Sequence, residues 1–334
     1  MNNKQWIEAT LAHRGTGRVP YNFMFSPLAQ KKAESCYGKP LHETLDLPLR
    51  MNGPVSLKPL YADPRQYGET IQDEFGVTWS TSLIDRGSPV RPCLTEPSLA
   101  GYTFPDPAAA CRYDRLGDWC DRNVSHYRIL WVGDLWERAT FMRGMENILI
   151  DLALHPGFVR GLLRGLTDHI LATTDILCSR FDFEGIAVSD DYGTQKAMLV
   201  SPRDWRAFIK PLLAQIYGLA GKHGRTVFHH SCGHITPIIG DLIDIGLDIL
   251  HPIQPETMDI HFLKKEFGDR LTFCGGLRTQ DLLAQAAPED IRREVRMLKE
   301  TMSGNGGYIL EPGITIQADV PLDNIAALID EARA

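Results

Sequence analysis

The stretch Thr226-Val-Phe-His-His-Ser-Cys-Gly-His234 combines a short apolar run with three histidines, a cysteine and a glycine. Side chains of a β-strand alternate between its two faces, so residues two apart point the same way. If the strand continues this far, His230 and Cys232 project together, while His229 and Ser231 face the other way. An imidazole and a thiolate on one face are half of a set of zinc ligands. The stretch therefore predicts a strand that ends in two candidate metal ligands.

On either side of this stretch, strand-like and helix-like patterns alternate. Helical patterns include 236–245, 260–267, 288–302 and 324–332, and the expected strands are 127–132, 185–189, 225–230, 247–251, 271–274 and 308–311. A spacing of roughly 25 to 40 residues between strands is typical of βαβ units and a parallel sheet. With a first strand at 18–25 there are about eight, which predicts a (β/α)8 TIM barrel. A doubly wound sheet is the alternative, although no GxGxxG motif follows the first strand.

Composition bounds the class of protein. The 334 residues are 43% hydrophobic and 23% charged, and no linker-like run divides them. We expect a single barrel domain over 1–334, with an N-terminal elaboration at about 26–125. The net charge of −7, without a basic run, argues against nucleic acid. Seven cysteines without a CxxC pair, and no apolar run of signal-peptide or membrane-spanning length, predict a cytoplasmic protein with reduced thiols and no membrane partner.

Polar residues recur where the expected strands end. Active sites of such barrels form at the carboxyl ends of the strands, so these side chains are expected to meet at one mouth. The group comprises Asp190, Asp191, His230, Cys232, His251, Cys274 and Glu311. Each alone is compatible with a core or loop role, and their convergence favours a function. Cys274 and Glu311 are the candidates for a third zinc ligand beside His230 and Cys232.

Several segments resemble the uroporphyrinogen decarboxylase-like superfamily, and most closely its branch of corrinoid-dependent methyltransferases. They are Asp190-Asp-Tyr-Gly-Thr-Gln195, Ser201-Pro-Arg-Asp-Trp-Arg206, His230-Ser-Cys-Gly233, Gly246-Leu-Asp-Ile-Leu-His-Pro-Ile-Gln254 and Phe273-Cys-Gly-Gly276. The resemblance covers about 126–332 and implies a (β/α)8 barrel. In that branch a His-x-Cys pair and a later cysteine bind zinc. His230 and Cys232 match the pair, but Glu311-Pro-Gly-Ile-Thr-Ile-Gln317 contains no cysteine.

The resemblance implies a zinc-dependent methyltransferase that works with a separate corrinoid (cobalamin) protein and a small methyl donor or thiol acceptor. Zinc polarises the donor's oxygen or lowers the pKa of the acceptor thiol. Aromatic residues favour a methoxylated substrate and thus an O-demethylase-like reaction. The candidate substrate-binding residues are Tyr21, Phe23, Trp131, Trp136, Tyr192 and Gln195. Asp191 or His251 is the candidate for handling a proton.

Two alternatives remain from the sequence. The first is a decarboxylase-like lyase acting on a tetrapyrrole, which needs cationic side chains at the mouth. Arg138, Arg143 and Arg278 are its candidates, but Arg18-Val-Pro-Tyr-Asn-Phe-Met-Phe25 stands where the decarboxylases carry an arginine-rich signature. The second is a non-catalytic barrel that binds a corrinoid or its carrier protein. The oligomeric state stays open, with a homodimer as one alternative.

Overall fold

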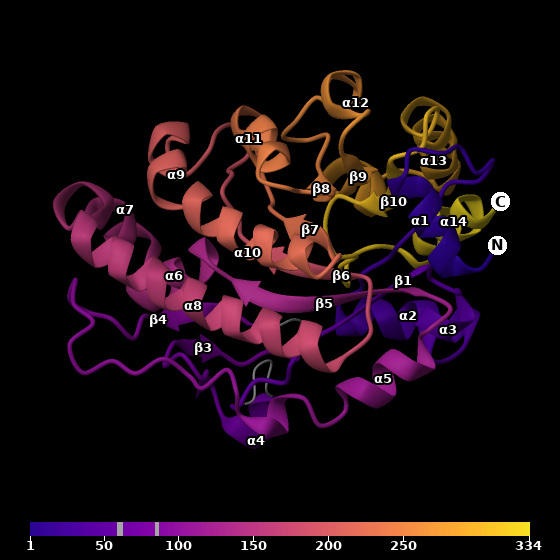
Figure 1. Cartoon of the computed structure of the whole chain (residues 1–334). Helices are drawn as coiled ribbons and strands as arrows, with labels where there is room; N and C mark the ends of the chain where they lie inside the picture. The colour runs from indigo at the N-terminus through magenta and orange to yellow at the C-terminus, as the bar shows by residue number, and fades with distance from the viewer. Residues whose placement is uncertain (59–62, 84–86) are drawn as a thin grey trace.

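A parallel sheet, curled on itself, forms the centre of the molecule (Figure 1). The structure, a computed structural model, describes residues 1–58, 63–83 and 87–334. Among these, the strands lie in the order β1 (Leu49–Asn52), β5 (Tyr127–Asp134), β6 (Gly185–Ser189), β7 (Thr226–His230), β8 (Ile249–Ile253), β9 (Thr272–Leu277) and β10 (Tyr308–Pro312). Neighbours in space are neighbours along the chain, which fits a barrel and not the reversing order of a doubly wound sheet.

The eighth position beside β10 is filled by an irregular segment at residues 20–25. Tyr21 forms a parallel bridge with Leu310, and the Asn22 amide donates to the Leu310 carbonyl at 2.9 Å. The prediction of a regular strand at 18–25 is therefore wrong, since this segment forms only isolated bridges. Pro20 has no N–H to donate to such a ladder. With this segment the sheet is a (β/α)8 TIM barrel, as predicted.

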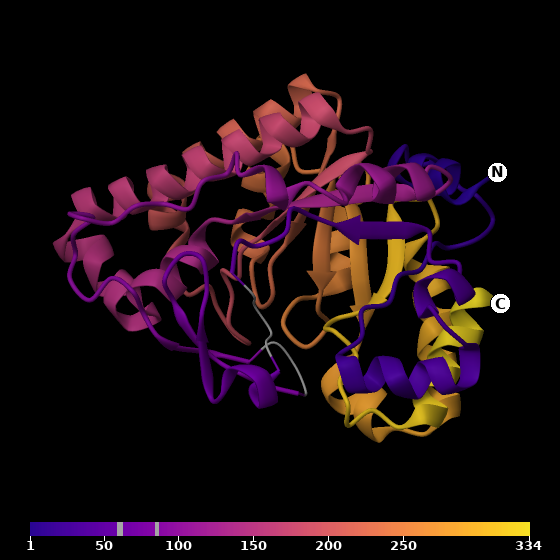
Figure 2. The same cartoon turned by 90° about the horizontal axis from the view of Figure 1, so that it is seen from below.

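Helices surround the barrel on its outside (Figure 2). They are α1 (Asn3–Leu11), α2 (Pro27–Tyr37), α3 (Leu41–Thr44), α4 (Pro64–Tyr67), α5 (Leu116–Arg122), α6 (Trp136–Arg143), α7 (Met145–Leu154), α8 (Pro156–Arg180), α9 (Pro202–Phe208), α10 (Lys210–Lys222), α11 (Ile239–Asp244), α12 (Ile260–Phe267), α13 (Pro288–Met302) and α14 (Leu322–Arg333). Ser201 caps α9 by accepting a hydrogen bond from the Asp204 amide, with Pro202 in the first turn. None of the helices in the described part of the chain combines the length and apolarity of a membrane span.

The region expected to elaborate the N-terminus contributes one barrel strand, β1, and a small separate sheet. In this sheet β2 (Thr70–Gln72), β3 (Thr78–Ser80) and β4 (Pro89–Arg91) run antiparallel. The buried carboxylate of Asp73 accepts hydrogen bonds from Trp79 Nε1 and from Arg138 on α6, at 2.9 and 2.8 Å. These hydrogen bonds connect the small sheet to α6, the helix that follows β5.

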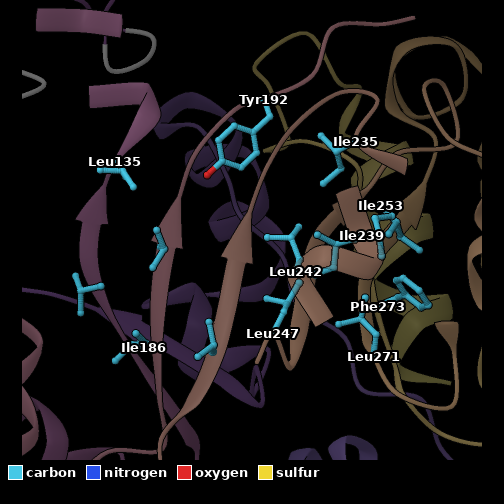
Figure 3. Close-up of a cluster of buried hydrophobic side chains, with 14 of the residues drawn as sticks. Leu135, Ile186, Tyr192, Ile235, Ile239, Leu242, Leu247, Ile253, Leu271 and Phe273 are labelled. Atoms are coloured by element: carbon cyan, nitrogen blue, oxygen red, sulfur yellow. The ribbon is translucent and has the colours of Figure 1, made fainter. Parts of the chain in front are cut away.

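Alternate residues along the strands divide into two buried sets. One set fills the barrel interior and consists of Ile7, Leu49, Tyr127, Ile129, Ala187, Phe228, Ile249, Cys274 and Ile309. The other points toward the helices and includes Ile186 and Phe273, which are labelled in Figure 3 with part of the larger core. Because side chains alternate, His230, His251 and Glu311 share the inward face of Phe228, Ile249 and Ile309. The strand pattern alone therefore delivers these three polar side chains to the barrel mouth.

Candidate metal centre at the barrel mouth

Three donor atoms gather where β6 and β7 end. His230 Nε2 lies 3.4 Å from Asp191 Oδ1 and 3.5 Å from Cys232 Sγ. Zinc bonds of about 2.0 to 2.3 Å place tetrahedral neighbours roughly 3.4 to 3.6 Å apart, so both spacings fit the edges of a zinc tetrahedron. The three side chains are only partly buried. This outer group (Asp191, His230 and Cys232) therefore suits a metal ion that stays accessible from the mouth.

The loops that carry the outer group are locked together by their backbones. The Cys232 amide donates to Asp191 Oδ1 at 2.8 Å. A Cβ on Gly193 would lie 2.4 Å from the His234 nitrogen, and Gly233, at φ +81°, would meet Gly193 as closely. Gln254 Oε1 accepts from the Gly233 amide at 2.6 Å. These contacts hold Cys232 beside Asp191.

A second group lies deeper, on β8, β9 and β10 themselves. Glu311 Oε2 lies 3.0 Å from Cys274 Sγ and 3.5 Å from His251 Nε2. His251 Nε2 is buried and has no hydrogen-bond partner in the described structure. The side-chain amide of Asn22 donates to Glu311 Oε1 at 3.0 Å. This inner group (His251, Cys274 and Glu311) is fully buried and offers the same three donor types as the outer one.

This arrangement changes the expected ligand set. His230 and Cys232 do project together, as the strand alternation predicted, but the donor beside them is Asp191. Cys274 and Glu311, the expected candidates for the third position, instead lie together with His251. The reason is depth, since Cys274 and Glu311 are strand residues inside the barrel, whereas Asp191 and Cys232 lie on loops beyond the strand ends. Asn22, which donates to Glu311, and Gln254, which accepts from the Gly233 amide, were not among the predicted site residues. Both lie in strand-end segments, where such residues are expected.

Charge and burial set the ionisation of both groups. Burial by itself lowers the pKa of His230, but hydrogen bonds to Asp191 and Cys232 outweigh it and raise the pKa to about 10. Burial raises the pKa of Glu311 to about 7, against hydrogen bonds from Cys274 and Asn22 that lower it. Burial also raises the pKa of the Cys274 thiol, and the nearby Glu311 carboxylate adds to this effect. Both shifts disfavour the anionic forms of Glu311 and Cys274 that a cation would require.

The histidine next to the pair faces away from the mouth. His229 Nδ1 shares a hydrogen bond of 2.7 Å with the Tyr217 hydroxyl on α10, and its ring stacks on Tyr192. Burial lowers the pKa of His229 to about 3, so its imidazole stays neutral. Its position confirms the predicted division of the two histidines between opposite faces, and its contacts are those of a core residue.

Asp190 joins the end of β6 to the loop after β5. Its fully buried carboxylate accepts from the Leu135 and Glu137 amides, both at 2.9 Å, and from the Tyr192 hydroxyl at 2.7 Å. Burial raises the pKa of Asp190 well above its usual range. Since these three donors come from the ends of β5 and β6, its role in the structure is to fix the strand end that precedes Asp191.

Replacing Asp190 with Ala is expected to lower the free energy of unfolding by about 3 kcal/mol, because three buried donors lose their acceptor. Asp190→Asn keeps an acceptor oxygen for the two amides and should cost only about 1 kcal/mol. Urea unfolding of both variants and the native protein measures the difference. Equal losses for the two variants would contradict the role assigned to the carboxylate oxygens.

Most of the aromatic residues expected to bind substrate are buried in the core. Tyr21 and Phe23 stack on each other, and the Tyr21 hydroxyl donates to the Leu45 carbonyl at 3.1 Å. Trp136 and Tyr192 have no exposed surface, and Figure 3 shows Tyr192 near the aliphatic core. Trp131 is half-buried at the mouth, with its ring edge against Phe228, and Gln195 is exposed on the loop after β6. Burial favours a packing role for the first four.

The three arginines considered for binding substrate carboxylates already have carboxylate partners. Arg138 pairs with Asp73 and Asp134, at 2.8 and 3.1 Å. Arg143 is buried against Asp151 at 2.6 Å, and Arg278 pairs with Asp281 and Glu294, at 2.7 and 3.2 Å. Since these charges are compensated within the protein, none of the three stands ready to hold an anionic substrate.

Comparison with known proteins agrees with this architecture. The family model for uroporphyrinogen decarboxylase (URO-D) matches residues 132–334. The uroporphyrinogen decarboxylase of Psychromonas ingrahamii is 25% identical over 280 residues, which are 78% of this chain and 75% of that protein. The one from Vesicomyosocius okutanii is 27% identical over 210 residues, 59% of this chain and 56% of that protein.

Among solved structures, a methyltransferase from Methanosarcina mazei has the same fold. It matches with a TM-score of 0.73 and 17% identity, covering 100% of this chain and 98% of that one. At this level of identity the match concerns the fold, whereas the family model covers more than half of the sequence itself. The chain therefore belongs to the uroporphyrinogen decarboxylase (URO-D) family.

Proposed function

We propose that this protein is a zinc-dependent methyltransferase that moves a methyl group between a small substrate and a corrinoid carried by a partner protein. The observation that carries the proposal is the outer group. Its imidazole nitrogen lies at zinc-ligand spacing from both the carboxylate oxygen and the thiol sulfur, and the three side chains are only partly buried. Three protein ligands with a fourth position open to substrate are typical of catalytic zinc.

Bound zinc supplies Lewis-acid chemistry, either by polarising the oxygen of a methyl donor or by lowering the pKa of an acceptor thiol. His230, Cys232 and Asp191 would hold the ion. His251 Nδ1 lies 2.9 Å from His230 Nδ1, so it orients the His230 ring and can hold the proton between them. Trp131 is a half-buried aromatic side chain packed against the barrel interior, and Gln195 is exposed on the loop after β6. Of the five aromatic candidates, Trp131 is the one that is not fully buried, and it favours a methoxylated aromatic donor and hence demethylation.

A tetrapyrrole decarboxylase is the second candidate, and the names of the curated relatives favour it. That reaction requires cationic groups at the mouth to hold the substrate's carboxylates. The three arginines nominated for this purpose are engaged with aspartate and glutamate side chains. The pairing of these arginines favours methyl transfer over decarboxylation.

Metal analysis and two activity assays on the purified protein test the proposal. We expect about one zinc per chain. We also expect conversion of cob(I)alamin to methylcobalamin in the presence of a methoxylated aromatic, followed by absorbance. Release of carbon dioxide from uroporphyrinogen III, without methyl transfer, would establish the decarboxylase instead. A folded, zinc-free protein that binds cobalamin without turning over either substrate would leave a non-catalytic binding barrel.

A further inference from the structure

The side chain of Gln254 connects two loops at the carboxyl ends of the strands. Gln254 directly follows β8 and is 8% exposed. Its Oε1 accepts from the Gly233 amide at 2.6 Å, and Gly233 lies on the loop after β7. Its Nε2 donates to the carbonyl of Gly313, the residue after β10, at 2.8 Å. Gln254 therefore joins the loop that carries Cys232 to the end of the last barrel strand.

These two hydrogen bonds fix the orientation of the side-chain amide. A backbone N–H donates and a carbonyl accepts, so the oxygen of Gln254 faces Gly233 and its nitrogen faces Gly313. The nitrogen carries two hydrogens, and the Gly313 carbonyl takes one of them. Cys232 Sγ lies 3.8 Å from the same nitrogen. Apart from the His230 ring, Gln254 is the one residue in the described part of the chain that hydrogen-bonds to this sulfur.

Resting on the proposed zinc dependence, we infer that Gln254 is a positioning residue of the candidate metal centre, which holds the loop of Cys232 in place and donates a hydrogen bond to its sulfur. A thiolate bound to a cation keeps lone pairs that accept hydrogen bonds. Such a bond withdraws charge from the sulfur, and the cation becomes a stronger Lewis acid. Because Oε1 is engaged with the Gly233 amide, Gln254 acts on the sulfur and not on the cation itself.

The main chain of Gln254 gives this side chain a fixed base. Its carbonyl accepts from the Thr257 and Met258 amides, both at 2.9 Å, and the Met258 side chain is buried. Turning the side-chain amide away from Cys232 would leave the Gly233 amide without its acceptor, in a place with little access to water. The donor is therefore held beside the sulfur before a cation arrives, as a supporting residue of a metal site requires.

Titration of the purified protein with Co²⁺ tests the inference, because a cobalt–thiolate bond gives a charge-transfer absorption. Gln254→Met should lower the affinity for Co²⁺ about 10- to 100-fold, the usual effect of removing a group that supports a metal ligand. At saturating Co²⁺ its absorption should lie at longer wavelength, because the sulfur retains more charge. Gln254→Glu keeps an oxygen for the Gly233 amide and has no second hydrogen for the sulfur. It should recover part of the affinity and keep the shifted absorption.

The matched control is Gln317→Met. Gln317 also follows β10, and its Nε2 donates to the Thr315 carbonyl of its own loop at 3.0 Å. This variant should have the affinity and the absorption of the native protein. Circular dichroism checks that each variant is folded, and Gln254→Glu decides the question if Gln254→Met does not fold.

Three results would overturn the inference. If the native protein shows the thiolate absorption and both Gln254 variants match it in affinity and wavelength, Gln254 does not support the metal centre, and the proposed function stands. If the Gln254 variants lose affinity but keep the native absorption when saturated, the residue holds the loop and does not donate to the sulfur. If the native protein gives no cobalt–thiolate absorption, the proposed zinc dependence fails together with the inference.

Discussion

Replacement of Cys232 with Ala is expected to lower the rate of methyl transfer at least about 100-fold, because replacing even the outer partners of a metal ligand typically costs 10–100-fold. Cys232 Sγ lies 3.5 Å from His230 Nε2, so the substitution removes one of the three donors of the outer group. The rate of methylcobalamin formation measures the effect.

The matched control for this loss is Cys36→Ala. Cys36 is exposed on α2, away from the barrel mouth, so its removal should leave the rate unchanged. Far-ultraviolet circular dichroism of both variants checks that the fold is retained. If Cys232→Ala keeps the native rate, the outer group does not take part in the reaction and the proposed mechanism is wrong.

Replacement of Arg128 with Met is expected to lower the free energy of unfolding by about 3 to 5 kcal/mol, the usual cost of removing one partner of a buried ion pair. Arg128 is 1% exposed at the start of β5. Its guanidinium contacts Glu184 at 2.7 and 2.9 Å, Asp182 at 2.8 Å and the Cys120 carbonyl at 3.0 Å. The variant leaves Glu184 with Lys4 as its remaining ion-pair partner among the described residues.

Arg206→Met provides the comparison on the surface. Arg206 is half-exposed and pairs with Asp241, which keeps a second partner in Lys210. Solvent and salt screen an exposed pair of this kind, so its loss should cost far less than the loss of Arg128. Guanidinium chloride unfolding of both variants gives the two losses. Similar values for Arg128→Met and Arg206→Met would contradict the stabilising role of the buried network.

Most of the regular strands and helices could be predicted from sequence periodicity, because the local pattern and the tertiary environment favour the same structure there. The predicted strand at 185–189 and the predicted helices at 260–267 and 288–302 have the bounds observed in β6, α12 and α13. The first strand did not follow the pattern, since residues 20–25 pair with β10 only at isolated bridges. β1 was hidden in a region with few clear periods, because four residues are too few to display alternation.

The candidate site was predictable in its location but not in its grouping. Alternation along a strand places His230 on the inward face, and the topology brings five neighbouring strands, β6 to β10, together. Which side chains touch depends on their depth along the barrel axis and on the paths of loops, which local sequence does not encode. For the same reason, the sequence could not predict that the side chains of Tyr192 and Trp136 lie in the core between the strands and the helices.

The contact between Gly193 and Gly233 limits how the surroundings of the site can diverge in evolution. A methyl group on either residue would overlap the backbone of the opposite loop, at 2.4 Å. Neither glycine can therefore be substituted alone, although neither residue takes part in any chemistry. The spacing between Asp191 and Cys232 is inherited through two residues that have no side chain, so a lineage that loses one glycine must rebuild both loops or abandon the outer group.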